Sequence, residues 1–127
     1  MPRLIPVLAT ALLLACGSVQ AQTKSPQPAL DCGAGPLAKT YGGTQWLVYA
    51  CSDNKSAVIV AAEGNPGMPF YFMSFPKNGQ RQLTGEGTGK KSVTDAAFKD
   101  LSKLSDQDVV ALIAAARVMP AQPASKR

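Results

Sequence analysis

The stretch at residues 83–95, LTGEGTGKKSVTD, holds residue types that bind phosphate in nucleotide enzymes. Three alternating glycines precede two lysines: Gly85, Gly87, Gly89, Lys90 and Lys91. A P-loop requires two glycines separated by four residues, the second followed directly by lysine and then by a hydroxyl residue. Here Thr84 stands where the first glycine is required, and Lys91 displaces the hydroxyl of Ser92 by one position. The spacing also differs from the dinucleotide motif G-x-G-x-x-G, so both nucleotide motifs are excluded.

The same residues could still form an anion-binding loop at the start of a helix. The first N–H groups of a helix have no partner within the helix, and with the helix dipole they attract negative charge. The three glycines would let an anion approach the backbone closely, and Lys90 and Lys91 would add positive charge. The alternative is a plain connecting loop, and the sequence leaves both interpretations open.

The cysteines predict one disulfide bond. The chain has three cysteines, Cys16, Cys32 and Cys51, and the first of them lies in a segment typical of an export signal. An even pair that remains in an exported chain favours a bridge between Cys32 and Cys51. Closing a loop of about 20 residues stabilises the fold by roughly 3 kcal/mol on the chain-entropy estimate. A redox or metal role is the weaker alternative, because no Cys-x-x-Cys spacing is present.

The absence of histidine excludes several chemistries. Without histidine the chain cannot form a Ser-His-Asp or Cys-His nucleophile system, and covalent haem attachment through Cys-x-x-Cys-His is also impossible. The acidic residues are scattered, mostly at turns and helix starts, where capping explains them. A glycosidase would need two carboxylates that converge in a cleft, and no spacing favours such a pair. We therefore expect no cofactor, no metal site and no catalytic residues.

The N-terminal segment predicts export. Arg3 precedes an apolar run at residues 4–15, and small residues follow up to Ala21, which is the layout of a signal peptide at residues 1–21. The run is too short to cross a bilayer, which needs about 20 residues. No later segment is long and apolar enough to do so, and we therefore do not expect a transmembrane protein. The expected location is periplasmic or secreted. Alternatively, Leu13-Leu14-Ala15-Cys16 resembles a lipobox, in which Cys16 would be lipidated and would anchor the protein.

The charge balance allows anionic partners but does not favour nucleic acid. The chain carries 13 basic and 8 acidic residues, which gives a formal net charge of +5. Such a surplus is compatible with an envelope protein, a cell-wall component or another anionic partner. Arginines are few and the expected compartment holds no nucleic acid, so nucleic-acid binding is not predicted.

The pattern of apolar residues and turns predicts an α+β fold. Four extended segments, separated by short turns, lie at residues 44–51, 56–62, 68–75 and 80–84. Connections this short allow only antiparallel pairing, so we expect a meander sheet of about four strands. A first helix, capped by Ser92 or Thr94, should reach about residue 103. A second should begin at Ser105 with a capping box, because Asp108 stands three positions later.

The second helix should pack one apolar stripe against the sheet, and both helices should cover the same sheet face. The stripe consists of Val109, Leu112, Ile113 and Ala116. Segments rich in proline, glycine and polar residues flank this single domain, which we place at residues 37–119. Residues 22–36 are expected to form a flexible leader, and residues 120–127 a disordered tail.

Aromatic residues in the predicted strands suggest a contact surface. If helices cover one face of the sheet, aromatic side chains on the other face could bind a partner. The candidates are Trp46, Tyr49, Tyr71 and Phe75. The alternative is a second small core beneath the leader and the Cys32 loop. We therefore expect a non-catalytic envelope binding or accessory protein, with a carboxylate-dependent hydrolase or a structural envelope or secretion component as alternatives.

Overall fold

The computed structural model describes Gly17 and residues 30–120, and over that part the chain is an α+β domain. Its elements are β1 (Ala34–Tyr41), β2 (Thr44–Ala50), β3 (Ala57–Ala61), β4 (Phe70–Lys77), β5 (Gln80–Gly87), α1 (Lys91–Ser102) and α2 (Asp106–Arg117). The predicted fold class is confirmed. The predicted signal peptide (Gly17 excepted), Cys16, the first part of the leader and residues 121–127 lie outside the described residues.

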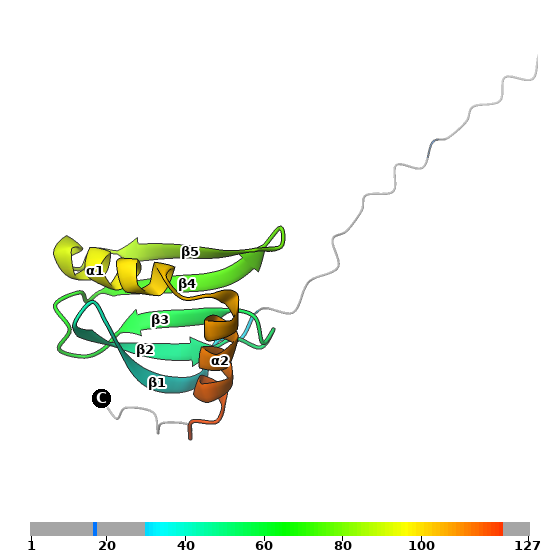
Figure 1. Cartoon of the computed structure of the whole chain (residues 1–127), viewed down its shortest axis with the longest axis horizontal. Coiled ribbons are helices and arrows are strands. Elements are labelled where there is room, and N and C mark those ends of the chain that lie inside the picture. Colours follow the sequence, from blue (N-terminus) through cyan, green and yellow to red (C-terminus); the bar gives the residue numbers. More distant parts are fainter. Residues whose placement is uncertain (1–16, 18–29, 121–127) are drawn as a thin grey trace, which may run out of the picture.

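The five strands form one antiparallel sheet in the order β1-β2-β3-β4-β5, the expected meander (Figure 1). Two hairpins have two-residue turns with positive φ at both positions, the geometry that suits the twist of the flanking strands. Gly42 and Gly43 connect β1 to β2, and Asn78 and Gly79 connect β4 to β5. The short turns therefore fix the strand order locally.

The sheet has five strands where about four were expected, because β1 was not predicted. β1 begins at Ala34, inside the segment predicted to be leader, and its sequence AGPLAKTY has few strand-favouring residues. It forms because β2 supplies an antiparallel partner, with Leu37 opposite Val48 and Tyr41 opposite Thr44, although the register is irregular between Ala34 and Leu37. Pro36 is tolerated because β1 is an edge strand, where a missing N–H need not interrupt a ladder.

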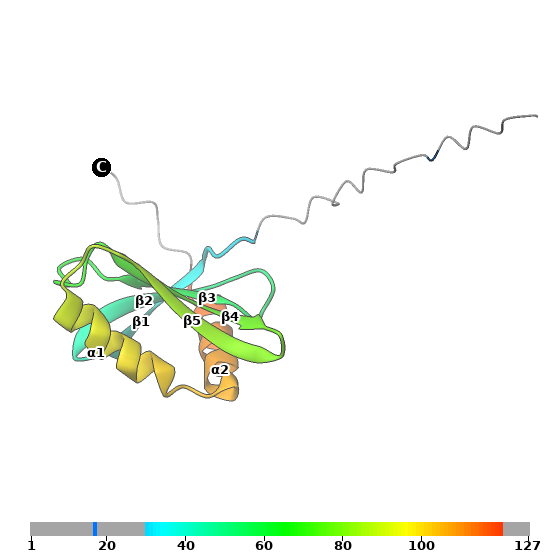
Figure 2. The ribbon, with the colours of Figure 1, turned by 90° about the horizontal axis from the view of Figure 1, so that it is seen from above.

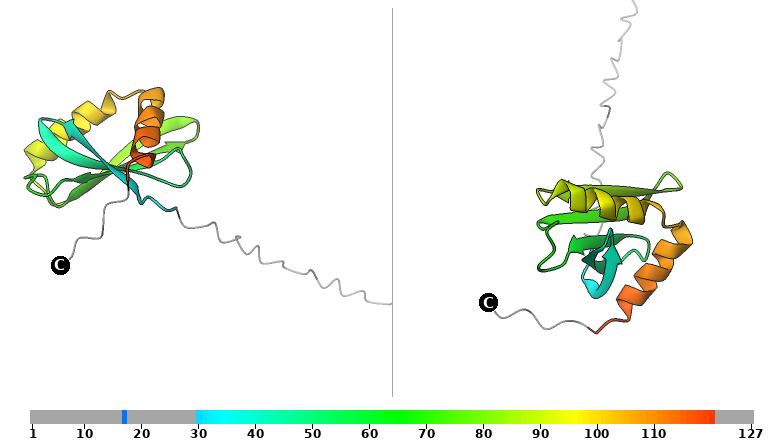
Figure 3. Two further views of the ribbon diagram at one scale, coloured as in Figure 1. Left: turned by 90° about the horizontal axis from the view of Figure 1, so that it is seen from below. Right: turned by 60° about the vertical axis from the view of Figure 1, so that its left-hand side comes forward.

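Both helices lie on one side of the sheet (Figures 2 and 3). The core between the two layers joins inward side chains of β2, β3 and β4 to the buried stripes of the helices. Its largest fully buried side chains are Trp46, Phe72, Ile59 and Val48. The predicted stripe of α2 is confirmed, since Val109, Leu112, Ile113 and Ala116 are all buried.

The two helices begin differently. In α2 the Ser105 hydroxyl accepts from the Asp108 N–H at 3.1 Å, and the Asp108 carboxylate accepts from the Ser105 N–H at 2.9 Å, so the predicted capping box is confirmed. The predicted caps of α1 were wrong, because its N-cap is Lys90, which makes no side-chain cap bond. Thr94 lies inside the helix and is buried.

The predicted disulfide is present between Cys32 and Cys51, which are 19 positions apart. It attaches the segment before β1 to the end of β2, where Cys51 is fully buried. The Arg117 guanidinium, at the end of α2, donates to the Cys51 carbonyl oxygen. Cys51, directly after β2, is therefore fixed by two contacts: the disulfide to Cys32 and the hydrogen bond from Arg117 in the last turn of α2.

Candidate functional site

The outward side of the central strands forms a continuous apolar surface, which we call the open face. It consists of Leu47, Tyr49, Val58, Val60, Tyr71, Met73 and Phe75. None of these seven side chains is buried, although they belong to the three central strands. The helices cover only the opposite side of the sheet, as Figure 3 (left) shows.

The strand register makes this surface contiguous. Leu47 lies opposite Val60, which in turn lies opposite Tyr71, and these three form one row across β2, β3 and β4. A second row is formed by Tyr49, Val58 and Met73. Directly opposed side chains in an antiparallel pair have Cβ atoms about 5 Å apart, so the rows leave no polar gap.

Polar residues border the open face on β5. Glu86 lies opposite Tyr71, and its carboxylate accepts a hydrogen bond from the Tyr71 hydroxyl at 3.0 Å. This bond, together with the negative charge of Glu86, raises the pKa of Tyr71, so the phenol remains a neutral donor. Gln82 lies opposite Phe75, and Thr84 lies opposite Met73. The apolar patch therefore ends at the edge strand.

A groove of about 440 Å³ deepens one end of the open face. Its walls come from Val58 and Val60 of β3, from Tyr71 of β4, and from Met68 and Pro69 in the connection between these strands. Met68 and Tyr71 are 47% and 41% exposed, which is high for large apolar side chains. The groove could accept an apolar side chain of another molecule.

Three of the four predicted partner-binding residues, Tyr49, Tyr71 and Phe75, lie on the open face. The fourth, Trp46, does not, and that part of the prediction was wrong. Trp46 points to the helix side and is 0% exposed. Its indole N–H donates to the Tyr41 carbonyl oxygen and to the Thr44 hydroxyl, at 3.2 and 2.9 Å.

Comparisons with protein-family models, with curated proteins and with solved structures find no match to this chain. Any function must therefore be argued from its own residues. Neither α1 nor α2, the helices of the described residues, has the length and apolarity that a membrane crossing requires.

The glycine–lysine stretch is a structural connection in which the backbone N–H groups of Thr88, Gly89 and Lys90 already have partners. Gly85 and Gly87 belong to β5 instead of a loop. The N–H groups of Thr88 and Gly89 both donate to the Pro69 carbonyl oxygen, and that of Lys90 donates to Pro66, at 3.0 to 3.2 Å. The Lys91 ammonium forms an ion pair with Asp95 at 2.7 Å. These contacts favour the connecting-loop interpretation over an anion site.

Packing explains why the stretch contains glycines. A Cβ atom on Gly85 would lie 2.8 Å from the Phe70 ring, so the aromatic side chain occupies the space above this strand. A Cβ atom on Gly89 would collide with the Gly67 carbonyl oxygen. The connection before α1 therefore passes directly against the β3–β4 connection.

Gly89→Ala should lower the free energy of unfolding by about 1–3 kcal/mol, because one backbone must move away from the other. Gly43→Asn is the control, since Gly43 has open space around it and asparagine tolerates its positive φ. Its cost should stay below about 1 kcal/mol. Urea denaturation followed by circular dichroism measures both. Equal stability of Gly89→Ala and wild type would contradict this contact.

The carboxylates also have structural partners. Among the described residues, every aspartate and glutamate except Glu63 accepts a hydrogen bond or ion pair: Asp31, Asp53, Glu86, Asp95, Asp100, Asp106 and Asp108. Asp100, for example, accepts from the Gly42 N–H at 2.6 Å and joins α1 to the first hairpin. No group of three potential metal ligands occurs in this part of the chain.

Proposed function

We propose that this chain is an exported, non-catalytic binding protein that holds a partner protein against its open face. The observation that carries the proposal is the contiguous apolar surface of β2, β3 and β4, which the protein's own helices leave uncovered.

Sheets with one face in water normally carry polar side chains on that face. The edge strand β5 follows this rule, with Gln82 and Thr84 directed outward. The three central strands depart from it, because they are apolar on both faces. This is the pattern of a sheet covered on both sides, and the partner would supply the second cover.

The composition of the open face favours a protein partner over an anionic cell-wall component. None of its seven residues is charged, and the charged residue opposite Tyr71 across the sheet, Glu86, is negative. The positive group on this face of β4, Lys77, lies two positions beyond Phe75 at the end of the strand, so an anion would meet it only at the border of the open face. An apolar protein surface would match the face, and one of its side chains could anchor in the groove beside Met68 and Tyr71.

The alternatives have weaker support. A carboxylate-dependent hydrolase would need two acidic groups free for chemistry, whereas those of the described residues mostly cap turns and helices or pair with basic groups. Export is supported by the disulfide, which forms in oxidising compartments. Intact mass of the exported product would distinguish a free periplasmic or secreted form from one anchored through Cys16.

The test compares two baits in affinity capture from envelope extract. Wild-type protein should capture a partner protein. The Tyr71→Ala/Phe75→Ala variant should capture at least about tenfold less of it, because aromatic anchors of this kind each contribute about 2 kcal/mol to binding. Gln82→Ala/Thr84→Ala is the matched control on the same side of the sheet, and it should retain the partner. Circular dichroism must show that all three proteins fold alike.

Two outcomes would contradict the proposal. If wild type and Tyr71→Ala/Phe75→Ala recover identical material, binding does not use the open face. If the purified protein associates with itself, and Tyr71→Ala/Phe75→Ala alone abolishes that association, the face is covered by a second copy instead of another protein. Sedimentation of the purified proteins distinguishes these cases.

A further inference from the structure

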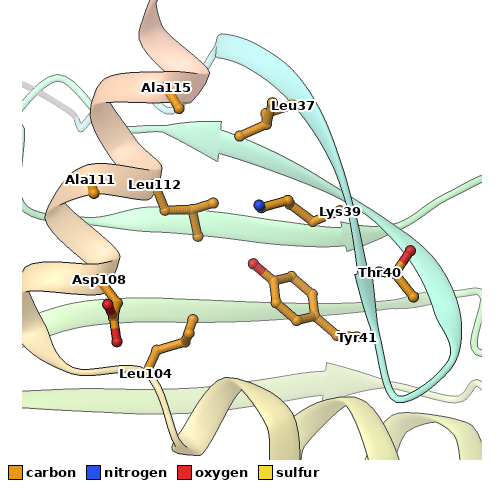
Figure 4. Close-up of a pocket in the computed structure, with 9 residues that line it drawn as sticks. All are labelled: Leu37, Lys39, Thr40, Tyr41, Leu104, Asp108, Ala111, Leu112 and Ala115. Carbon is orange, nitrogen blue, oxygen red and sulfur yellow. The ribbon is translucent and has the colours of Figure 1, made fainter.

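A cavity of about 520 Å³ lies between β1 and α2, on the helix-bearing side of the sheet (Figure 4). It shares no lining residue with the groove of the open face, so a ligand bound here would not involve the proposed partner surface. Much of its wall is apolar, with Leu37 from β1 and Ala111, Leu112 and Ala115 from α2. Its size falls within the range of pockets that hold small organic ligands, about 300–1,000 Å³.

Two hydrogen-bond donors from β1 point into this cavity. Figure 4 shows the Lys39 nitrogen and the Tyr41 oxygen directed into the space between β1 and α2. Neither group has a hydrogen bond or ion-pair partner among the described residues. Tyr41 as a whole is only 7% exposed. Among the described residues, no side-chain polar atom is both fully buried and without a hydrogen-bond partner. The Tyr41 hydroxyl has no such partner, so it cannot be fully buried, and Figure 4 shows it directed into the cavity. Burial raises the pKa of Tyr41, which keeps the phenol a neutral donor.

The acidic group of the cavity is held at the opposite wall. The Asp108 carboxylate accepts a hydrogen bond from the Ser105 N–H. This bond lowers the pKa of Asp108, so the carboxylate is charged at neutral pH. It lies in the first turn of α2, where the positive end of the helix dipole offsets its charge. Figure 4 places Asp108 beside Leu104 and away from Leu37 and Ala115. A ligand could therefore direct an anionic group to Lys39 and an apolar body toward Leu37 and Ala115.

We infer that this cavity binds a small aliphatic monocarboxylate. The carboxylate would accept hydrogen bonds from the Lys39 ammonium and the Tyr41 hydroxyl, and the chain would lie along Leu37, Leu112 and Ala115. Apolar walls with a few convergent donors are the usual composition of such sites.

A lysine on the inward side of an edge strand also has a simpler use. Lys39 lies opposite Trp46, on the face that packs against the helices, and an inward charge discourages pairing with a strand of another molecule. That use does not require the adjacent cavity, nor the Tyr41 hydroxyl that opens into it. The two roles differ in what a Lys39 variant should change.

The experiment is an NMR titration of the exported, processed protein with decanoate, below the concentration at which it forms micelles. Decanol and decyltrimethylammonium serve as neutral and cationic probes of the same length. Saturable shifts are expected at the amides of Leu37, Tyr41 and Leu112. Lys39→Met should weaken decanoate binding about tenfold, the effect of losing one charge-assisted hydrogen bond, and should leave decanol binding unchanged.

A matched pair of α2 variants separates the cavity from general apolar binding. Ala115→Leu would narrow the cavity at the wall where the aliphatic chain is expected to lie, and leucine is well tolerated in helices. Ala114→Leu adds the same side chain at an exposed neighbour that does not line the cavity. Decanoate binding should be weakened in the first variant and unchanged in the second.

Three results would overturn the inference. Shifts confined to the open face, near Tyr71 and Met73, would place the probe elsewhere. Equal binding by Ala115→Leu and Ala114→Leu would exclude the cavity. Unchanged decanoate affinity in Lys39→Met, with more aggregation, would leave Lys39 only its role in protecting the edge strand.

Discussion

Replacing Trp46 with alanine should lower the free energy of unfolding by about 3–5 kcal/mol, as truncation of a fully buried aromatic side chain usually does. Trp46 packs against Phe72, with ring centroids 5.1 Å apart, and is completely buried. Its indole N–H also bonds the Tyr41 carbonyl and the Thr44 hydroxyl, at both ends of the first hairpin turn. Domains are typically stable by 5–15 kcal/mol, so this variant should retain little margin.

Trp46→Phe and Phe75→Ala make the measurement specific. Trp46→Phe keeps most of the apolar volume and loses the N–H, so we expect a smaller cost of about 1–2 kcal/mol. Phe75→Ala removes an aromatic group from the open face and should cost less than Trp46→Ala, because Phe75 is only partly buried. Since Trp46 is the only tryptophan, urea denaturation must be followed by far-ultraviolet circular dichroism instead of fluorescence. A cost below about 1 kcal/mol for Trp46→Ala would contradict the burial.

The position of Trp46 shows what the sequence could and could not predict. Strand alternation places Trp46 and Tyr49 on opposite faces, since neighbours two apart share a face, so the two could not both belong to one exposed surface. It cannot tell which face the helices cover, because the central strands are apolar on both. The small side chains of Ala50, Ala57 and Ala61 on the inward face leave room for the helices to approach. That fit between layers depends on residues distant in the chain.

Elements that begin or end at a local sequence motif, such as a turn or a helix cap, were predicted from the sequence. The short turns between extended segments, of which Asn78-Gly79 is one, and the Ser105 capping box each act within a few residues, and both are present. β1 and the end of β5 depend on partners instead. Gly85 and Gly87 read as a loop, yet β4 pairs with them, and the Phe70 and Phe72 rings lie close to Gly85. Pairing of this kind cannot be inferred from the glycine stretch alone.

The candidate sites divide in the same way. Tyr49, Tyr71 and Phe75 could be named in advance because alternation and residue type are local properties. The cavity between β1 and α2 could not, because its donors lie on a strand that the sequence did not indicate and its walls on a helix far along the chain. Lys39 and Tyr41 carry no motif, and only the packing of α2 beside β1 brings them to one space.

Removing the Cys32–Cys51 bridge should cost about 3 kcal/mol, because the unfolded chain regains the freedom of a loop closed across 19 positions. The segment before β1 would keep two hydrogen bonds to the end of β2. They join the Ser52 N–H to the Asp31 carbonyl at 2.6 Å, and the Asp31 N–H to the Ser52 hydroxyl at 3.2 Å. Two such bonds contribute less than the bridge, so residues near Cys32 should exchange amide hydrogens faster, while β3 and β4 remain protected.

Cys32→Ala/Cys51→Ala is the variant to measure, because alanine leaves no polar group at the buried Cys51 position. Its unfolding free energy is compared with that of oxidised and reduced wild type, and reduced wild type should match the variant within about 1 kcal/mol. Thiol labelling of exported protein provides the independent check. If both thiols of the exported protein were free, the disulfide would no longer be evidence for an oxidising compartment. Two adjacent cysteines would be expected to oxidise in such a compartment. The uncovered apolar face would still favour a partner, but the compartment in which that partner is sought would change.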